Sequence, residues 1–140
     1  MEKKTVTEKD LIEIALKARK NAYVPYSHFA VGAALLARNG RVYTGCNIEN
    51  ATFTPTVCAE RTAFFGAVCE GVRGFDAIAV VGEKEEEEPR TECPPCGVCR
   101  QVMREFCDDD FKIILGTKDS FKVYKLSEIL PLGFSVKNIQ

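Results

Sequence analysis

Three segments in the second half of the chain decide its fold: DAIAVV at residues 76–81, GVCRQVMREF at residues 97–106 and FKIIL at residues 111–115. The first and third are short apolar runs rich in β-branched residues, which favour buried strands. In the second, apolar residues recur every four positions from Val98, which indicates a helix. A strand, a helix and a strand in this order predict two parallel strands joined by a right-handed crossover.

Segments on either side extend this unit to a larger sheet. FAVGAALLA at residues 29–37 and RVYTGCNIE at residues 41–49 flank Asn39-Gly40, a pair whose two positive φ angles suit a tight hairpin turn. We therefore expect an antiparallel hairpin ahead of the parallel pair. The stretch at residues 121–134 is expected to begin with a fifth strand, and Pro131 with Gly133 to stop any regular element.

Two further helices complete the expected fold. Thr7 and Asp10 have the spacing of a capping box, and the helical pattern that follows must stop by Pro25. Residues 58–71, CAERTAFFGAVCEG, place small residues on one face and end at Gly71. The elements predict a single domain over residues 1–140, with a three-layer α/β/α fold around a mixed five-stranded sheet that has an N-terminal hairpin.

Composition argues against several classes of protein. The 140 residues carry 19 basic and 20 acidic side chains, a formal net charge of -1, so no broad nucleic-acid-binding surface is expected. No apolar run reaches the roughly 18 residues of a membrane span, and the first ten residues lack the apolar core of a signal peptide. Seven cysteines, an odd number, favour metal or thiol chemistry in the reducing cytoplasm over a disulfide framework.

The cysteines that carry chemistry lie at two expected helix starts, in Cys58-Ala59-Glu60 and in the Pro95–Cys99 motif PCGVC. Cysteines at positions i and i+3 share a helical face, and a third from the other helix start completes a three-thiolate site for one Zn²⁺ per chain. Cys58, Cys96 and Cys99 are therefore the predicted ligands. Three protein ligands leave the fourth tetrahedral position for water, as in a catalytic zinc site.

Cys93-Pro94-Pro95-Cys96 is a second CxxC motif that overlaps the first. With Cys93 as a fourth ligand the zinc site would be closed, as in a structural domain that binds a protein partner without catalysis. The stiff Pro-Pro pair works against that geometry. In the open site Glu60 acquires a purpose, because it can take a proton from the zinc-bound water and pass it to the substrate.

These motifs resemble the cytidine deaminase family, specifically its small homotetrameric, zinc-dependent form. The resemblance rests on CAER at residues 58–61 and PCGVCR at residues 95–100, and extends to YSHFAVGAA at residues 26–34 and GCNIENA at residues 45–51. It implies a cytidine-deaminase-like fold and a hydrolase that converts cytidine and 2′-deoxycytidine to uridine and 2′-deoxyuridine with release of ammonia, a step of pyrimidine salvage. Glu60 would protonate the ring nitrogen beside carbon 4 and later the departing amino group.

The resemblance also implies further site residues. Asn47 and Glu49 would bind the 3′-hydroxyl of the ribose, and Phe29 would contact the pyrimidine. In a homotetramer with shared active sites, Phe134 of the C-terminal tail would stack near the base. The remaining substrate-binding positions that it implies are Ala51, Phe53 and Ala59.

Arg61 is a candidate for charge compensation at the metal. Three thiolates on one Zn²⁺ sum to -1, and excess negative charge weakens zinc as a Lewis acid. Arg61 lies three residues after Cys58, on the same helical face, where its guanidinium can donate to a coordinating sulfur. Arg100, beside Cys99, is a second candidate donor. The alternative for Arg61 is an ordinary surface ion pair.

Two other enzyme functions are compatible with the same zinc motifs. A blasticidin-type deaminase would act on a modified cytosine nucleoside in place of cytidine. An RNA- or DNA-editing deaminase would need a basic channel and stacking aromatic residues, against which the net charge of -1 and the absence of tryptophan argue. The acidic run Glu85–Glu88 is expected to be solvated charge, and no function is assigned to the longer acidic insert Glu83–Glu88.

Overall fold

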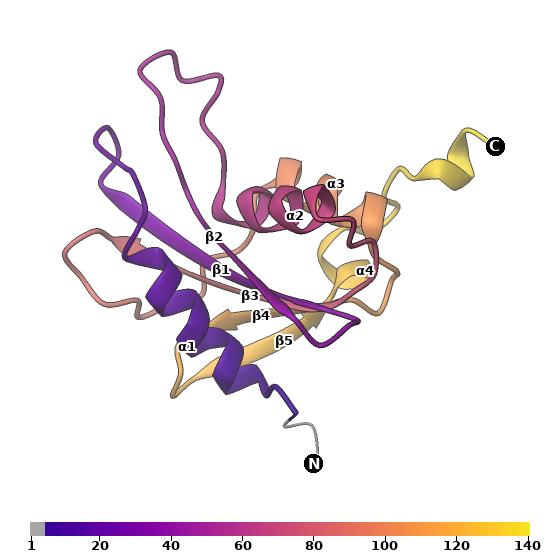
Figure 1. The fold of residues 1–140 in the computed structure, drawn as a ribbon, viewed down its shortest axis with the longest axis horizontal. Coiled ribbons are helices and arrows are strands. Elements are labelled where there is room, and N and C mark those ends of the chain that lie inside the picture. The colour runs from indigo at the N-terminus through magenta and orange to yellow at the C-terminus, as the bar shows by residue number, and fades with distance from the viewer. Residues whose placement is uncertain (1–4) are drawn as a thin grey trace.

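A computed structural model describes residues 5–140 (Figure 1). Residues 1–4, which belong to the stretch predicted to lack a signal peptide, lie outside the described residues. In chain order the elements are α1 (Glu8–Arg19), β1 (Phe29–Ala37), β2 (Val42–Cys46), α2 (Ala59–Cys69), β3 (Phe75–Lys84), α3 (Gly97–Phe106), β4 (Lys112–Gly116), β5 (Phe121–Lys125), α4 (Leu126–Ile129) and a 3-10 turn at Val136–Asn138.

The five strands form one mixed sheet in the order β2-β1-β3-β4-β5. β3 and β4 are parallel, and the other neighbouring strands are antiparallel, so the predicted hairpin and the predicted parallel pair are both confirmed. Helix α1 packs on one face of the sheet, and α2 and α3 cover the other (Figure 1). Two apolar cores therefore lie on opposite faces of the same strands, as the three-layer prediction requires.

The turn between β1 and β2 differs from the prediction. Gly40 has a φ of +87°, but Asn39 is not among the residues with a positive φ, so only one of the two expected left-handed residues is present. The amide of Ala37 donates to the carbonyl of Arg41, which closes a three-residue loop with glycine last. The Asn39 side chain accepts from the Arg41 amide at 2.8 Å, a local bond that stabilises the turn.

The capping box at the start of α1 is present, but the helix ends well before Pro25. The Asp10 amide donates to Thr7 Oγ1 at 3.1 Å, and the Thr7 amide donates to Asp10 Oδ2 at 3.0 Å. The last helical residue is Arg19. Beyond it the chain leaves the helix because the Tyr23 amide donates to the carbonyl of Asn47, past the end of β2.

Helix α2 lies directly on β2 because small residues allow the close approach. A Cβ at Gly45 would overlap the backbone of Ala59 and Ala63, so only glycine fits at this crossing. Thr62 Oγ1 donates to the carbonyl of Cys46 at 3.0 Å and holds the first turn of α2 against the end of the strand. The start of α2 is thereby placed beside residues 46–49.

The helices of the described chain are short. The longest, α1, has 12 residues, and none of those in residues 5–140 is long and apolar enough to cross a membrane. Helix α4 follows β5 directly and ends before Pro131, as the predicted stop at Pro131 and Gly133 requires; the prediction was wrong only in that a 3-10 turn follows Gly133. Leu126 explains α4: its side chain is fully buried, and its amide donates to the carbonyl of Phe111.

Candidate metal centre

Two helix starts bring the three predicted ligands together. Cys58 is the N-cap of α2 and Cys96 the N-cap of α3, and neither side chain makes a capping hydrogen bond to its own helix. Cys99 lies in the first turn of α3. The three Sγ atoms lie within 4.8 Å of one another. The predicted cluster is therefore present, with its sulfurs free to bind an ion.

The donor set and its spacing fit zinc. Two sulfurs bound to one tetrahedral zinc ion, with bonds of about 2.3 Å, lie roughly 3.8 Å apart. The Sγ atoms of Cys58 and Cys96 are 3.7 Å apart. Thiolates are also the ligands that zinc prefers in tetrahedral sites. The described part of the chain places these three cysteines, without Cys93, in one group able to hold a metal ion.

The cysteine cluster holds a ready thiolate at Cys58. A hydrogen bond with Cys99 lowers the pKa of Cys58 to about 5, helped by the Arg61 guanidinium and opposed by burial. The same hydrogen bond raises the pKa of Cys99, which keeps the shared proton. A sulfur that is deprotonated near neutral pH is the form that binds metal.

Glu60 lies in the first turn of α2, two residues after Cys58. Its side chain is buried, with 4% of the residue exposed, and Cys99 lies close enough to act on the pKa of its carboxyl group, which it lowers. Burial is the main cause that raises the pKa of Glu60, to about 7, and the nearby Cys58 raises it further. A desolvated carboxyl group beside a metal cluster is typical of a residue that transfers protons.

Arg61 makes the predicted contact with a ligand sulfur, whereas Arg100 does not. Arg61 Nη2 donates to Cys58 Sγ at 3.4 Å, and this hydrogen bond is the main cause that raises the pKa of Arg61. Arg100 donates instead to two carbonyls, those of Pro95 at 2.7 Å and Ile129 at 2.6 Å. It therefore fixes the backbone just before Cys96, a role that the sequence did not indicate.

Cys93 lies outside the three-cysteine cluster, beside Phe29. A Cβ at Gly82 would lie 2.6 Å from Cys93 Sγ and 3.1 Å both from the Phe29 ring and from Val31, so these side chains meet over Gly82. Burial raises the pKa of Cys93 to about 11, and the charge of Glu60 contributes. Cys93 is thus held as a neutral thiol close enough to Glu60 to sense its charge.

Asn47, just past the end of the neighbouring strand β2, braces the start of β1. Its Oδ1 accepts from the Val31 amide at 2.9 Å, and its Nδ2 donates to the Phe29 carbonyl at 2.8 Å. A side-chain amide has two donor hydrogens and two lone pairs on oxygen, so each end keeps capacity for a second bond. The Phe29 residue itself is 39% exposed.

Glu49 braces the adjoining loop in the same way. Its Oε1 accepts from the amides of Tyr26 at 3.0 Å and Ser27 at 3.1 Å. Hydrogen bonds, that of the Ser27 side chain foremost, lower the pKa of Glu49. Asn47 and Glu49 therefore bond the same segment, residues 26–31. Glu49 stays a carboxylate, which can accept a hydrogen bond from a hydroxyl group.

The other three positions implied near the site differ in exposure. Ala51 and Phe53 lie on the exposed loop between β2 and α2, and Phe53 has a left-handed φ of +64°. The Phe53 ring meets the Tyr26 ring edge-on, with centroids 5.8 Å apart. Ala59 is fully buried at the start of α2. Phe53 thus makes an exposed aromatic contact with Tyr26, whereas Ala59 is enclosed at the helix start.

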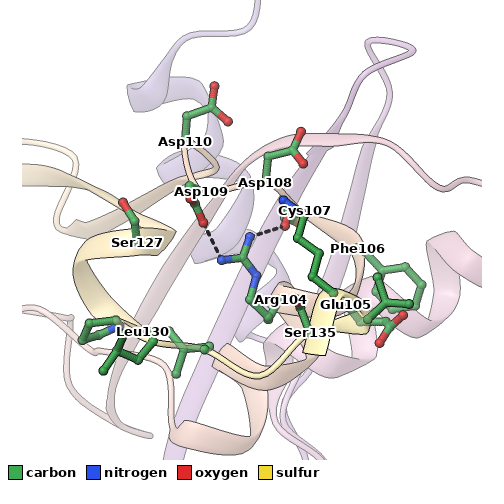
Figure 2. A pocket seen from close by; sticks show the side chains of 15 residues that line it. Arg104, Glu105, Phe106, Cys107, Asp108, Asp109, Asp110, Ser127, Leu130 and Ser135 are labelled. Carbon is green, nitrogen blue, oxygen red and sulfur yellow. Dashed lines mark hydrogen bonds and ion pairs between the residues drawn. The ribbon is translucent and has the colours of Figure 1, made fainter. Parts of the chain in front are cut away.

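Phe134 lies on the C-terminal tail, which extends away from the domain (yellow in Figure 1). The tail borders a pocket of about 770 Å³ at the C-terminal end of α3, whose lining includes neither the three clustered cysteines nor Glu60. Arg104 points into this pocket and donates to Asp109 Oδ1 and to the Cys107 carbonyl (Figure 2). Gln101 donates to the Phe134 carbonyl at 2.9 Å, and Phe134 remains 58% exposed.

The chain is similar to known proteins over most of its length. The family model of the cytidine and deoxycytidylate deaminase zinc-binding region matches residues 5–115. A cytidine deaminase of Sporosarcina psychrophila is 49% identical over 130 residues, which cover 92% of either chain. One of Halalkalibacterium halodurans is 48% identical over 130 residues, covering 92% of this chain and 95% of the other. The crystal structure of a cytidine deaminase from Burkholderia pseudomallei has a TM-score of 0.83 and 44% identity, covering 91% of this chain and 99% of that one.

Proposed function

The chain belongs to the zinc-binding cytidine deaminase family and is a hydrolase, and we propose that its substrates are cytidine and 2′-deoxycytidine. The products are uridine and 2′-deoxyuridine. One observation carries the proposal: a buried carboxyl group, Glu60, lies against a cluster of three cysteines at two helix starts. This arrangement combines a metal site with a proton carrier, which hydrolytic deamination requires.

The protein would supply three sulfur ligands to the metal ion and leave its fourth coordination position open. Cys58, Cys96 and Cys99 would hold one Zn²⁺ per chain, and Arg100 secures the backbone that leads into Cys96. Zinc bound by three protein ligands supplies a Lewis acid that makes water more acidic. Cys93 takes no part as a ligand, and the site therefore stays open to substrate.

Glu60 moves the protons of the reaction. The attacking water loses a proton, which Glu60 passes to the ring nitrogen beside carbon 4 of the cytosine. A second proton passes from the added hydroxyl group through Glu60 to the amino group, so that water is added and ammonia leaves. The burial of Glu60 favours this role, because a desolvated carboxyl group in a fixed place exchanges protons with its neighbours and not with bulk water.

The nucleoside is held by the segment that Asn47 and Glu49 brace. The remaining hydrogen-bonding capacity of both side chains would bind the 3′-hydroxyl of the ribose, and the exposed face of Phe29 would contact the base. Ala51 and Phe53 would line the edge of the substrate pocket, and Ala59 its bottom. A neutral nucleoside suits an edge that carries the carboxylate of Glu49.

The proposal is tested by following the loss of cytidine absorbance with and without a zinc chelator. Turnover that stops with the chelator and returns on adding Zn²⁺ is the expected result. Turnover of a modified cytosine nucleoside without turnover of cytidine would favour the blasticidin-type alternative. Bound zinc without turnover of either would favour a structural four-cysteine domain.

We propose that Arg61 tunes the metal by drawing charge from Cys58. Arg61→Gln is expected to weaken zinc retention by about 10-fold against a competing chelator, because neighbours that hydrogen-bond metal ligands contribute on that scale. Arg41→Gln, in the exposed β1–β2 turn, is the matched control and should retain zinc as the native chain does. Equal zinc retention in both variants would leave Arg61 as ordinary surface charge.

We propose further that the enzyme is a homotetramer in which neighbouring chains complete each other's sites. The tail carries apolar residues that remain half or more exposed within residues 5–140: Leu132, Phe134, Val136 and Ile139. Gln101 anchors the tail by donating to the Phe134 carbonyl, and the Phe134 residue remains 58% exposed. Light scattering should give four times the mass of one chain. A monomer with full activity would contradict the proposal.

We also propose that residues 1–140 form one domain and that it works in the cytoplasm. A single sheet spans β1 to β5, and both apolar cores pack on it, which supports one folding unit. All seven cysteines are free thiols, which suits a reducing compartment.

A further inference from the structure

Arg19 is a buried arginine at the end of α1 with an unusual set of partners. The residue is 8% exposed. Its Nε donates to the carbonyl of Ala30 at 2.9 Å. Its Nη2 lies 3.0 Å, 2.7 Å and 2.8 Å from the carbonyl oxygens of Glu83, Lys84 and Glu87. One guanidinium therefore joins the start of β1, the end of β3 and the acidic loop that follows.

The position of Arg19 is fixed by the helix that carries it. A Cβ at Gly32 would overlap the carbonyl of Ala15 and lie 2.6 Å from the Arg19 amide nitrogen, so the end of α1 rests directly on β1. In the β1–β3 ladder Ala30 pairs with Glu83, and Arg19 bonds the carbonyls of both residues. Arg19 thus binds carbonyls of both strands at the same rung.

Arg19 and Asn47 together hold three consecutive residues of β1. Asn47 bonds the Phe29 carbonyl and the Val31 amide, and Arg19 bonds the carbonyl of Ala30 between them. Because backbone groups of alternate residues point to opposite edges of a strand, the two side chains grip it from opposite edges. The direction in which Phe29 leaves the strand is set by this grip.

The acidic loop takes part in the same arrangement. Arg19 holds the carbonyl of Glu87, and the Glu85 amide in turn donates to the carbonyl of His28 at 2.7 Å. His28 precedes Phe29 and has a left-handed φ of +57°, a conformation that costs free energy in a residue other than glycine. The loop that appeared as solvated charge in the sequence therefore helps to hold His28 in that conformation.

This arrangement fixes one wall of the proposed substrate site, where the side chains of Phe29 and Cys93 meet over Gly82. Burying a guanidinium against neutral carbonyls costs desolvation, which its hydrogen bonds must offset. Stability alone would be served by apolar side chains at this place. The benefit is a rigid base-contacting wall, because small displacements of binding groups are costly to an enzyme.

We propose that Arg19 is a positioning residue for substrate binding: it clamps β1, β3 and the acidic loop so that Phe29 is held against the base. The inference rests on the proposed function, in which Phe29 contacts the pyrimidine. Arg19 itself does not touch the substrate or the metal ligands.

Steady-state kinetics on the zinc-loaded protein test the clamp. Arg19→Gln keeps one donor group at this place but loses the fork that spans β1 and β3, and is expected to raise KM for cytidine by about 10-fold with kcat within about 3-fold of native. Arg19→Lys keeps the charge and should show a smaller rise in KM. Arg73→Gln is the matched control. Arg73 also donates to backbone carbonyls, those of Val68 and Val72 at the C-terminal end of α2.

The structural readout is independent of turnover. In ¹H–¹⁵N spectra of both Arg19 variants, the amide signals of Phe29, Val31 and Glu85 should shift while zinc content stays at about one per chain. Unshifted signals would overturn the clamp even if cytidine were not the substrate, whereas failure of the native chain to turn over cytidine would overturn only the proposed function.

The kinetic outcomes decide the rest. An unchanged KM in folded Arg19→Gln would overturn the inference. An equal rise in KM in Arg73→Gln, in step with the loss in Tm, would also overturn it, since the effect would then reflect general destabilisation. If Arg19→Gln does not fold, Arg19→Lys decides by the same criteria.

Discussion

Glu60→Gln is expected to lower the rate of cytidine deamination by about 10³-fold or more while the protein keeps its fold and its zinc. The glutamine has the same shape but cannot carry a proton between water, ring nitrogen and amino group. The three clustered cysteines do not depend on the charge of this side chain for their placement, which the two helix starts determine. Activity by absorbance, zinc by atomic absorption and Tm by calorimetry measure the three properties separately.

A second glutamate provides the matched control. Glu8 also lies in the first turn of a helix, α1, where it interacts favourably with the helix dipole but is distant in sequence from any cysteine. Glu8→Gln should leave turnover unchanged. Near-native turnover in Glu60→Gln, or an equal loss in both variants, would show that Glu60 is only a helix-start residue. The Tm of Glu60→Gln should not fall, since the substitution removes a buried charge.

Elements whose signals are local were predicted well from the sequence. The capping box of Thr7 and Asp10, the stop at Gly71 and the strand, helix and strand from residue 75 to residue 116 depend on neighbouring residues and on periodicity. The metal cluster was predicted for the same reason. Each cysteine is tied to a helix start, and packing of two helices on one face of the sheet brings those starts together.

The features that were missed depend on contacts between distant residues. Arg19 is an ordinary residue of an amphipathic helix in the sequence, and its carbonyl partners lie up to 68 positions away. The sequence argued against Cys93 as a fourth ligand but did not show where its side chain lies, because spacing alone does not reveal that it meets Phe29 over Gly82. The turn at Asn39 was wrong for a smaller reason: a side-chain bond to Arg41 favours one of two turn types that the same dipeptide allows.

Cys99→Ser is expected to lose zinc, whereas Cys93→Ser is expected to keep about one zinc per chain. Serine is a poor zinc ligand, and two remaining thiolates hold the ion far more weakly than three. Cys99 is buried in the first turn of α3 with its sulfur inside the cluster, whereas Cys93 lies beside Phe29 as a neutral thiol. The two substitutions are matched in size and chemistry and lie six positions apart, so their difference reports ligation.

Metal content and cytidine turnover should therefore separate the two readings of the overlapping CxxC motifs. In an open three-cysteine site, Cys93→Ser keeps both zinc and measurable turnover, and Cys99→Ser loses both. In a closed four-cysteine site, Cys93→Ser would lose zinc as Cys99→Ser does. The closed site would also leave Glu60 without a reaction to serve, because a zinc ion with four thiolates has no position for water. Loss of zinc in Cys93→Ser, with zinc retained in Cys99→Ser, would contradict both the ligand assignment and the proton path through Glu60.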